Sequence, residues 1–194
     1  MNILLDRQPN AVTVNGLRYP LETDFRAAVK FELLVSSGEE DLLTLMTPFY
    51  PNGLHGNAED AVTAALWFYR CGEDLPETKD TKKRTPSYSF EVDADTIFAD
   101  FWRYYNIDLS SEALHWWTFR ALLAGLPDDS GYKERVYYRT CELKGLPKQE
   151  QDRIKRIRKL IAITKENKRK MTLEERNALM LEYAAKRSEE TKEG

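Results

Sequence analysis

The sequence predicts a mainly α-helical protein: a compact multi-helix domain with a small N-terminal β-hairpin and a C-terminal helical extension. Two observations lead to this fold class. Apolar residues recur every three or four positions in several segments, and most of these segments begin with a residue that can cap a helix. Over residues 11–20, apolar and polar residues alternate around a turn signal, as is typical of a tight hairpin.

The hairpin and the first helix are predicted from local signals. An Asn-Gly pair suits a type I′ turn, because both central residues need a positive φ, which Asn15 and Gly16 tolerate best. Thr23 or Asp24 can then cap a helix. That helix carries apolar residues on one face, namely Phe25, Ala28, Val29 and Leu33.

Seven further helices are predicted along the chain. Those before Pro147 cover residues 40–49, Asn57 to Gly72, Asp93 or Asp95 to Tyr105, Asp108–Ser111 to Gly125, and residues 132–143. Pro147 suits the first position of a long basic helix from Lys148 to about Lys165, and a Thr172–Glu175 capping box starts a last helix to about Arg187. We expect a core domain over residues 1–147, with a flexible charged loop at 73–87, and an appended segment over 148–194.

Charge is unevenly distributed along the 194 residues, whose formal net charge is −3. Residues 1–147 carry 15 Lys and Arg against 23 Asp and Glu, whereas residues 148–170 carry 10 against 3. The acidic body argues against a general nucleic-acid binder. Cys71 and Cys141 are the two cysteines, and their wide spacing suggests a reducing cytoplasm. No apolar run is long enough to predict a membrane span.

Residues that could support catalysis or metal binding are scattered singly. His55, Cys71, His115 and Cys141 do not have the spacing of a metal site, and neither histidine is placed to activate a cysteine. A glycine-rich phosphate loop and a nucleophile elbow are also missing from the sequence. We therefore predict a protein that is not an enzyme, with no catalytic residues, no metal and no cofactor.

The stretch from Tyr88 to Leu126 is unusually aromatic, which commits it to a core or to a large anchoring surface. On a helix, Trp116 and Trp117 would point about 100° apart. One interpretation places one of them in the core and the other at a packing edge. The other makes one of them an anchor for a partner, since tryptophan is favoured at binding hot spots. His115 is expected to form hydrogen bonds beside them.

The basic helix also allows several interpretations. Ile154, Ile157 and Ile161 form one stripe, which suggests a helix docked by its isoleucines with a charged outer face. The charged face could instead bind an acidic partner protein, pair with the acidic body, or bind nucleic acid or an anionic membrane surface.

Several landmarks together resemble one family. They include Asp24-Phe25-Arg26, Phe68-Tyr69-Arg70-Cys71-Gly72, Tyr88-Ser89-Phe90, Tyr138-Arg139 and, most specifically, Leu114-His115-Trp116-Trp117. In order and spacing they resemble the bacteriophage gene-product-fifteen family, tail-region proteins of long-tailed phages and prophages of Gram-positive bacteria. The resemblance covers about residues 1–165.

The resemblance implies a place in the phage tail module, beside the gene for the tape-measure protein. Proteins there commonly act as tail assembly chaperones, so the expected partners are the tape-measure protein and possibly the tail-tube protein, with a homo-oligomer also possible. We expect such a chaperone in the host cytoplasm and not in the mature virion. An amphipathic client helix would lie in an apolar groove. The residues expected to bind the partner are Trp116, Trp117, Trp102, Phe119, Arg153, Arg156 and Lys159. The alternatives are a minor structural component of the tail and, less favoured, a nucleic-acid-binding regulator.

Overall fold

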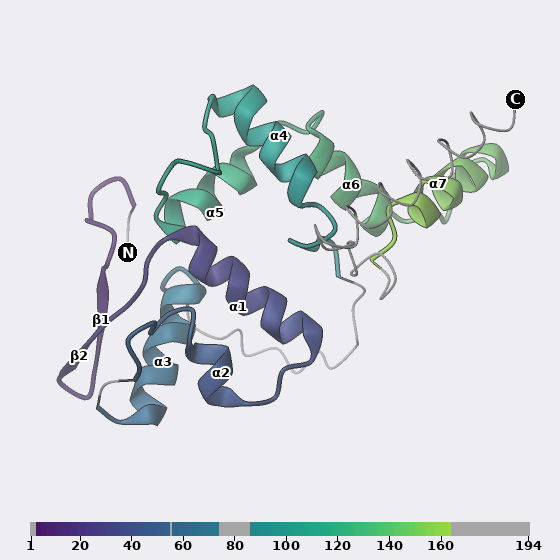
Figure 1. Ribbon diagram of the computed structural model, residues 1–194. Coiled ribbons are helices and arrows are strands. Elements are labelled where there is room, and N and C mark those ends of the chain that lie inside the picture. Colours follow the sequence, from purple (N-terminus) through teal and green to yellow (C-terminus); the bar gives the residue numbers. More distant parts are fainter. Residues whose placement is uncertain (1–2, 55, 74–85, 164–194) are drawn as a thin grey trace, which may run out of the picture. The chain divides into compact units, whose positions relative to one another are not determined.

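The computed structural model describes residues 3–54, 56–73 and 86–163. In these ranges the chain forms β1 (Ala11–Val14), β2 (Leu17–Pro20), α1 (Phe25–Ser37), α2 (Leu42–Met46), α3 (Ala58–Tyr69), α4 (Ala94–Tyr105), α5 (Trp116–Gly125), α6 (Gly131–Thr140) and α7 (Lys148–Leu160) (Figure 1). The predicted fold class is therefore confirmed: the chain is mainly helical with a small N-terminal hairpin. Most of the predicted loop at 73–87 and the predicted last helix lie outside the described residues.

The hairpin pairs its two strands in antiparallel register, with Val14 opposite Leu17. Asn15 and Gly16 have φ values of 50° and 79°, as a type I′ turn requires. β1 lies along α3. The hydroxyl of the buried Tyr19 accepts a hydrogen bond from the backbone N–H of Asn57, just before that helix begins. The hairpin is thus fastened to the start of α3.

Two helices begin at the predicted capping residues, and one predicted helix is shorter than expected. The Asp24 carboxylate accepts from the Arg26 N–H at 2.9 Å, and the Asn57 amide oxygen accepts from the Glu59 N–H at 2.8 Å. α2 has five residues instead of the predicted span of 40–49. It starts late because the Asp41 carboxylate caps the Thr44 N–H. It ends early because Pro48 has no backbone N–H with which to continue the helical hydrogen bonds.

The start of α5 also differs from the prediction, which placed the cap at Asp108–Ser111. The Asp108 carboxylate instead accepts from the N–H and hydroxyl of Ser110 in a local turn. The N-cap is His115, whose Nδ1 accepts from the Trp117 N–H at 3.1 Å. The adjoining backbone pairs with the start of α1, since Phe25 N–H donates to Leu114 and Trp116 N–H donates to Thr23, both at 2.8 Å. Helices α1 and α5 therefore begin side by side.

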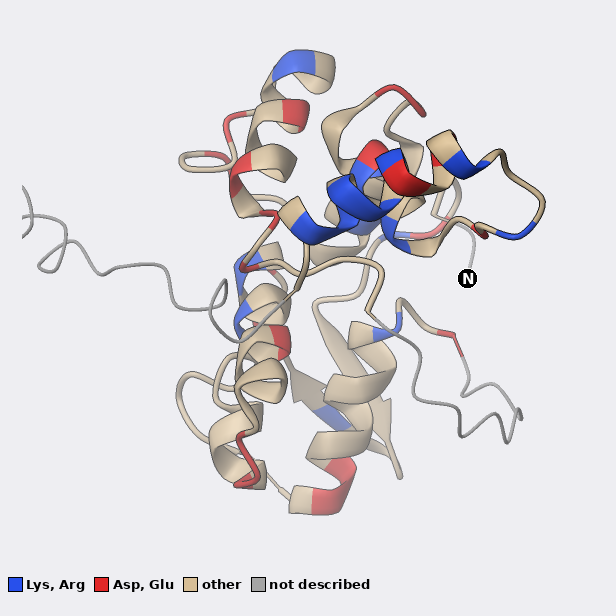
Figure 2. Cartoon of the chain, turned by 90° about the vertical axis from the view of Figure 1, so that its right-hand side faces the viewer, with Lys and Arg blue, Asp and Glu red and all other residues tan. Residues whose placement is uncertain are grey.

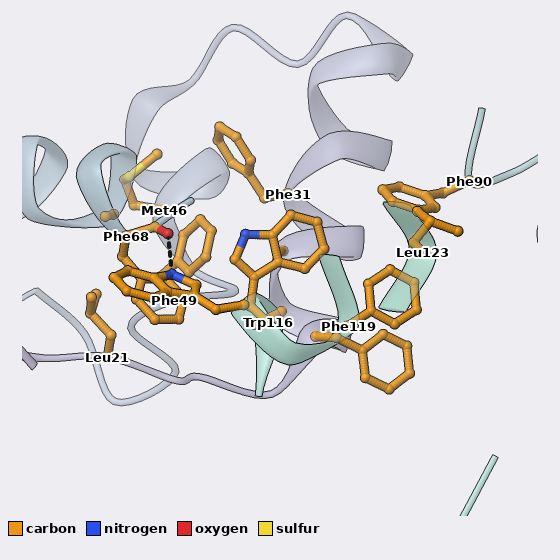
Figure 3. Close-up of a cluster of buried hydrophobic side chains, with 14 of the residues drawn as sticks. Leu21, Phe31, Met46, Phe49, Phe68, Phe90, Trp116, Phe119 and Leu123 are labelled. Atoms are coloured by element: carbon orange, nitrogen blue, oxygen red, sulfur yellow. Dashed lines mark hydrogen bonds between the residues drawn. The ribbon is translucent and has the colours of Figure 1, made fainter. Parts of the chain in front are cut away.

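The core lies where α1, α3 and α5 meet (Figure 3). Trp116 is fully buried at its centre and stacks against Tyr69 and Phe119. Trp117 is also buried, so the expectation of one tryptophan at a packing edge is wrong. Both indoles can be buried because their N–H groups donate to carbonyls at the end of α3. Trp116 bonds Tyr69 O and Trp117 bonds Phe68 O, each at 2.8 Å. Carbonyls in the last turn of a helix lack partners within the helix.

Helices α4 and α6 are joined through a buried carboxylate. Asp100 on α4 accepts hydrogen bonds from the backbone N–H groups of Gly131 at 3.2 Å and Tyr132 at 2.7 Å. These N–H groups belong to the first turn of α6, which has no intrahelical partners for them. Asp100 therefore acts as a second cap, supplied from another helix, beside the N-cap Ser130.

Replacing Asp100 with alanine is expected to lower the free energy of unfolding by about 1–3 kcal/mol, because two buried N–H groups would lose their acceptor. Urea denaturation followed by tryptophan fluorescence measures the change. The matched control is Asp128→Ala, an exposed carboxylate two residues before the N-cap of α6, which should change stability by less than about 0.5 kcal/mol. Equal effects of the two substitutions would contradict the capping role.

A second buried carboxylate ties the last helices to the body. Asp93 is the N-cap of α4 as predicted, but its side chain does not cap the helix. It binds Arg139 through two bonds of 2.6 and 2.8 Å and Arg135 through one of 2.9 Å. Arg139 also donates to Ile161 O, just after α7. The compact unit accordingly extends to Ile161 and includes α7.

Candidate partner-binding surfaces

The aromatic residues predicted to bind a partner fall into two groups. Trp116, Trp117 and Phe119 are buried, with 0%, 4% and 1% of their surfaces exposed. Trp102 on α4 is 53% exposed. Side chains in the first group pack and position α5, so they have no surface for a partner to contact in this conformation. Of the four aromatic candidates, Trp102 is therefore the one that could contact a partner directly.

Trp102 has an aromatic neighbour that the sequence analysis did not single out. Phe98 precedes it by four positions and is 40% exposed, so the two side chains lie next to each other on the helix surface. Opposite them, α4 buries Ile97, Asp100 and Phe101. We name Phe98 and Trp102 the α4 aromatic pair. Their spacing was visible in the sequence, but their exposure depends on which face of α4 meets the rest of the fold.

The predicted basic residues lie on the outside of α7. Ile154 is buried, which confirms that the helix docks by its isoleucine stripe, and Ile157 is half-buried. Arg153, Arg156 and Lys159 are exposed, and positions occupied by Lys and Arg, coloured blue, are frequent along the ribbon of this helix in Figure 2. Arg158 instead points inward and donates to the backbone carbonyls of Tyr138 and Cys141. It therefore holds α7 against the end of α6 and does not belong to the exposed face.

Some of the charge on α7 is compensated within the helix. Arg153 lies 3.6 Å from Glu150, and Lys155 lies 3.7 Å from Asp152, both as exposed pairs. Exposed pairs of this kind contribute little to stability. Among the described residues, Lys159 has no ion-pair partner and Arg156 bonds only the carbonyl of Asp152. We name Arg153, Arg156 and Lys159 the α7 cationic face.

A broad hollow of the described surface runs along α1. It has a volume of about 1110 Å³, and we name it the α1 groove. One wall is the stripe of α1 from Arg26 to Ser37, and the other comes from α2 and the residues after it. Its lining includes the apolar side chains Ala27, Leu33, Leu34, Pro48 and Pro51, the charged residues Glu22, Asp24, Arg26 and Lys30, and five serines and threonines.

A polar cluster surrounds the half-buried side chain of Glu32. Its carboxylate accepts hydrogen bonds from the hydroxyls of Tyr69 at 2.5 Å and Tyr88 at 3.0 Å, which join α1, α3 and the segment before α4. Burial raises the pKa of Glu32, and the two tyrosine bonds and the charge of Arg120 only partly oppose this effect. Burial and the nearby Glu32 charge raise the pKa of both tyrosines, which therefore remain protonated donors.

Glu32→Gln is expected to gain stability relative to the natural protein as pH rises. A carboxyl whose pKa is raised on folding stabilises the fold fully below its unfolded pKa and loses that contribution as pH rises through the folded pKa. Glutamine does not titrate and still offers an oxygen to Tyr69 and Tyr88. Urea denaturation of both proteins at pH 4 and pH 7 measures the effect. A difference that stays constant, or that shifts in favour of the natural protein between pH 4 and pH 7, would contradict the assignment.

The surroundings of His115 and Cys71 indicate that both side chains have structural roles. Both ring nitrogens of His115 are occupied, because Nδ1 accepts from Trp117 and Nε2 lies 3.0 Å from the carbonyl oxygen of Pro9. Burial lowers the pKa of His115 and raises that of the Cys71 thiol, which makes Cys71 a poor nucleophile at neutral pH. Within residues 3–54, 56–73 and 86–163, no group of three or more His, Cys, Asp or Glu side chains could hold a metal ion.

The helical core presents the α4 aromatic pair, the α7 cationic face and the α1 groove at its surface. These features suit a protein that binds a partner. The sequence matches the family described as Bacteriophage Gp15 protein over residues 4–163. The chain therefore belongs to the Bacteriophage Gp15 protein family, and this membership indicates a structural or tail-related phage protein. No curated protein and no solved structure matches it significantly. Among the described helices, none is long and apolar enough to cross a membrane.

Proposed function

We propose that this protein is a tail assembly chaperone that binds the tape-measure protein while the phage tail is built. It acts without catalysis, in the host cytoplasm, and is absent from the finished virion. The observation that carries the proposal is the family match over residues 4–163, together with the tail-module position that the family resemblance implies. The tail-tube protein is a possible second partner.

The α4 aromatic pair supplies the first contact for this client. Exposed aromatic side chains next to each other are costly in water and mark sites where a partner can bury them. Trp102, with half of its surface exposed, has the residue type most enriched at binding hot spots. A long client with repeated apolar positions could occupy many such sites, each of them weak, on successive chaperone molecules.

The α7 cationic face supplies a second contact, to acidic residues of the client. Arg153, Arg156 and Lys159 are exposed on a helix that is firmly docked through Ile154 and Arg158. Contacts between opposite charges steer association. They weaken as salt is added, because salt screens charges from each other over about 8 Å at physiological ionic strength. The aromatic contact does not share this dependence, so high salt should weaken client binding without abolishing it.

Co-expression with the tape-measure protein of the same tail module tests the proposal, followed by affinity pull-down and size-exclusion chromatography. We expect a complex in the soluble fraction and aggregation of the tape-measure protein when it is expressed alone. A tape-measure protein that is soluble alone and forms no complex would contradict the proposal. Detection of the protein in purified virions would then favour a minor structural component of the tail.

A further inference from the structure

The α1 groove has the shape of a site for a single helix. Its α1 wall is formed by Arg26, Ala27, Lys30, Leu33, Leu34 and Ser37, a stripe along almost the whole helix. At 1.5 Å per residue this stripe is about 17 Å long. A helix of about 10 Å diameter occupies about 120 Å³ per residue. The volume of about 1110 Å³ corresponds to about nine residues, which span about 14 Å and therefore lie within the length of the α1 wall.

The walls of the groove are less polar than their residue types suggest. The hydroxyl of Ser37 donates to Leu34 O, that of Thr44 to Asp41, and that of Thr47 to Leu43 O. Because these hydroxyl protons already have acceptors within the chain, the groove can receive an apolar surface without leaving donors unsatisfied.

Asp24 and Arg26 compensate each other's charge in the groove, whereas Glu22 and Lys30 have no ion-pair partner among the described residues. Asp24 and Arg26 pair through two bonds of 3.0 Å, and Arg26 also donates to the carbonyls of Leu109 and Glu112. Glu22 accepts from the Asp24 N–H. Lys30, midway along the α1 wall, is exposed and has no ion-pair partner among the described residues. An occupant that complements the middle of the α1 wall therefore needs one acidic side chain opposite Lys30.

We propose that the α1 groove binds an amphipathic helix of the client, with its apolar side on Leu33 and Leu34 and a carboxylate paired with Lys30. The inference rests on the proposed function, which makes the client the tape-measure protein. It adds a third contact and assigns the chemistry of the recognised segment: about nine helical residues with apolar positions three and four apart and an acidic residue beside them.

Two variants of the full chain, co-expressed with the tape-measure protein, test this site. Lys30→Glu places a carboxylate opposite the proposed acidic residue, and like charges at an interface cost enough to reduce the recovered tape-measure protein by about tenfold. Lys144→Glu is the matched control, since it makes the same charge change at an exposed position of the loop before α7. It should leave recovery unchanged.

Photo-crosslinking gives an independent readout without changing the charge of the groove. A benzoylphenylalanine introduced at Ser37, on the groove wall, should form a covalent adduct with the tape-measure protein, and one at Lys144 should not. A complex with the natural chain, but equal recovery for the two charge variants and no adduct from Ser37, would overturn the groove assignment alone. If the natural chain forms no complex, the proposed function fails and the groove assignment fails with it.

Discussion

Replacing Asp93 with alanine is expected to lower the free energy of unfolding by about 3–5 kcal/mol. The substitution leaves two arginines without their carboxylate, and removing one partner of a buried ion pair is costly because the remaining charge stays desolvated. Arg139 is 5% exposed and Arg135 is 32% exposed, so most of the cost arises at Arg139. The N–H of Ser89, which also donates to Asp93, loses its acceptor. Urea denaturation monitored by circular dichroism measures the change.

Arg135→Ala is the matched control, because it removes one bond to the same carboxylate from a more exposed position. It should lower the free energy of unfolding clearly less than Asp93→Ala does.

The pH dependence of stability provides a second check. Burial alone would raise the pKa of Asp93, but Arg139, the Ser89 N–H and Arg135 outweigh it and lower the pKa. The stabilisation is therefore present above the unfolded pKa and is lost as pH falls through the lower folded pKa. An Asp93→Ala protein as stable as the natural one at pH 7 would contradict this account.

Replacing Trp116 with alanine is expected to cost about 3–5 kcal/mol through the cavity left in the core. Trp116 is fully buried and contacts the rings of Tyr69, Phe90 and Phe119. Its N–H also satisfies the carbonyl of Tyr69 at the end of α3, which would lose this donor. Thermal unfolding should show a decrease in melting temperature of about 6–20 °C for a domain of this size.

Trp102→Ala is the contrasting substitution, because it removes the same residue type from a surface that is half exposed. It should change the melting temperature by about 2 °C or less. Similar losses from the two substitutions would mean that Trp102 also contributes to the core. They would then contradict the division of the aromatic candidates into packing and surface residues.

Features that depend on neighbouring residues were predictable from the sequence. The type I′ turn at Asn15 and Gly16 needs two adjacent residues that tolerate positive φ, and the caps at Asp24 and Asn57 bond N–H groups only two positions away. The isoleucine stripe of α7 follows from helical periodicity, and Ile154 is buried as that stripe requires. In each case the physical cause acts within a few residues, so no knowledge of the tertiary fold is needed.

Features created by distant residues were not predictable in the same way. The sequence marks Asp93 as a helix cap, but its carboxylate is taken by arginines more than forty residues later. Asp100 caps a helix that starts thirty-one residues after it. Trp117 is buried because α3 offers its N–H a carbonyl from Phe68. At each position a residue distant in the sequence determines the structure. For the same reason, the sequence alone could not show that Trp102 is exposed and Trp116 is buried.

The measurement that tests the central claim most directly compares client binding by two exposed-aromatic variants. Trp102→Ala removes the principal anchor of the α4 aromatic pair, and Tyr137→Ala removes an aromatic of similar exposure from α6, 58% against 53%. In pull-downs of the co-expressed tape-measure protein, Trp102→Ala should reduce recovery by about tenfold or more while Tyr137→Ala leaves it unchanged. Equal recovery by both variants and the natural chain would show that the α4 aromatic pair does not bind the client.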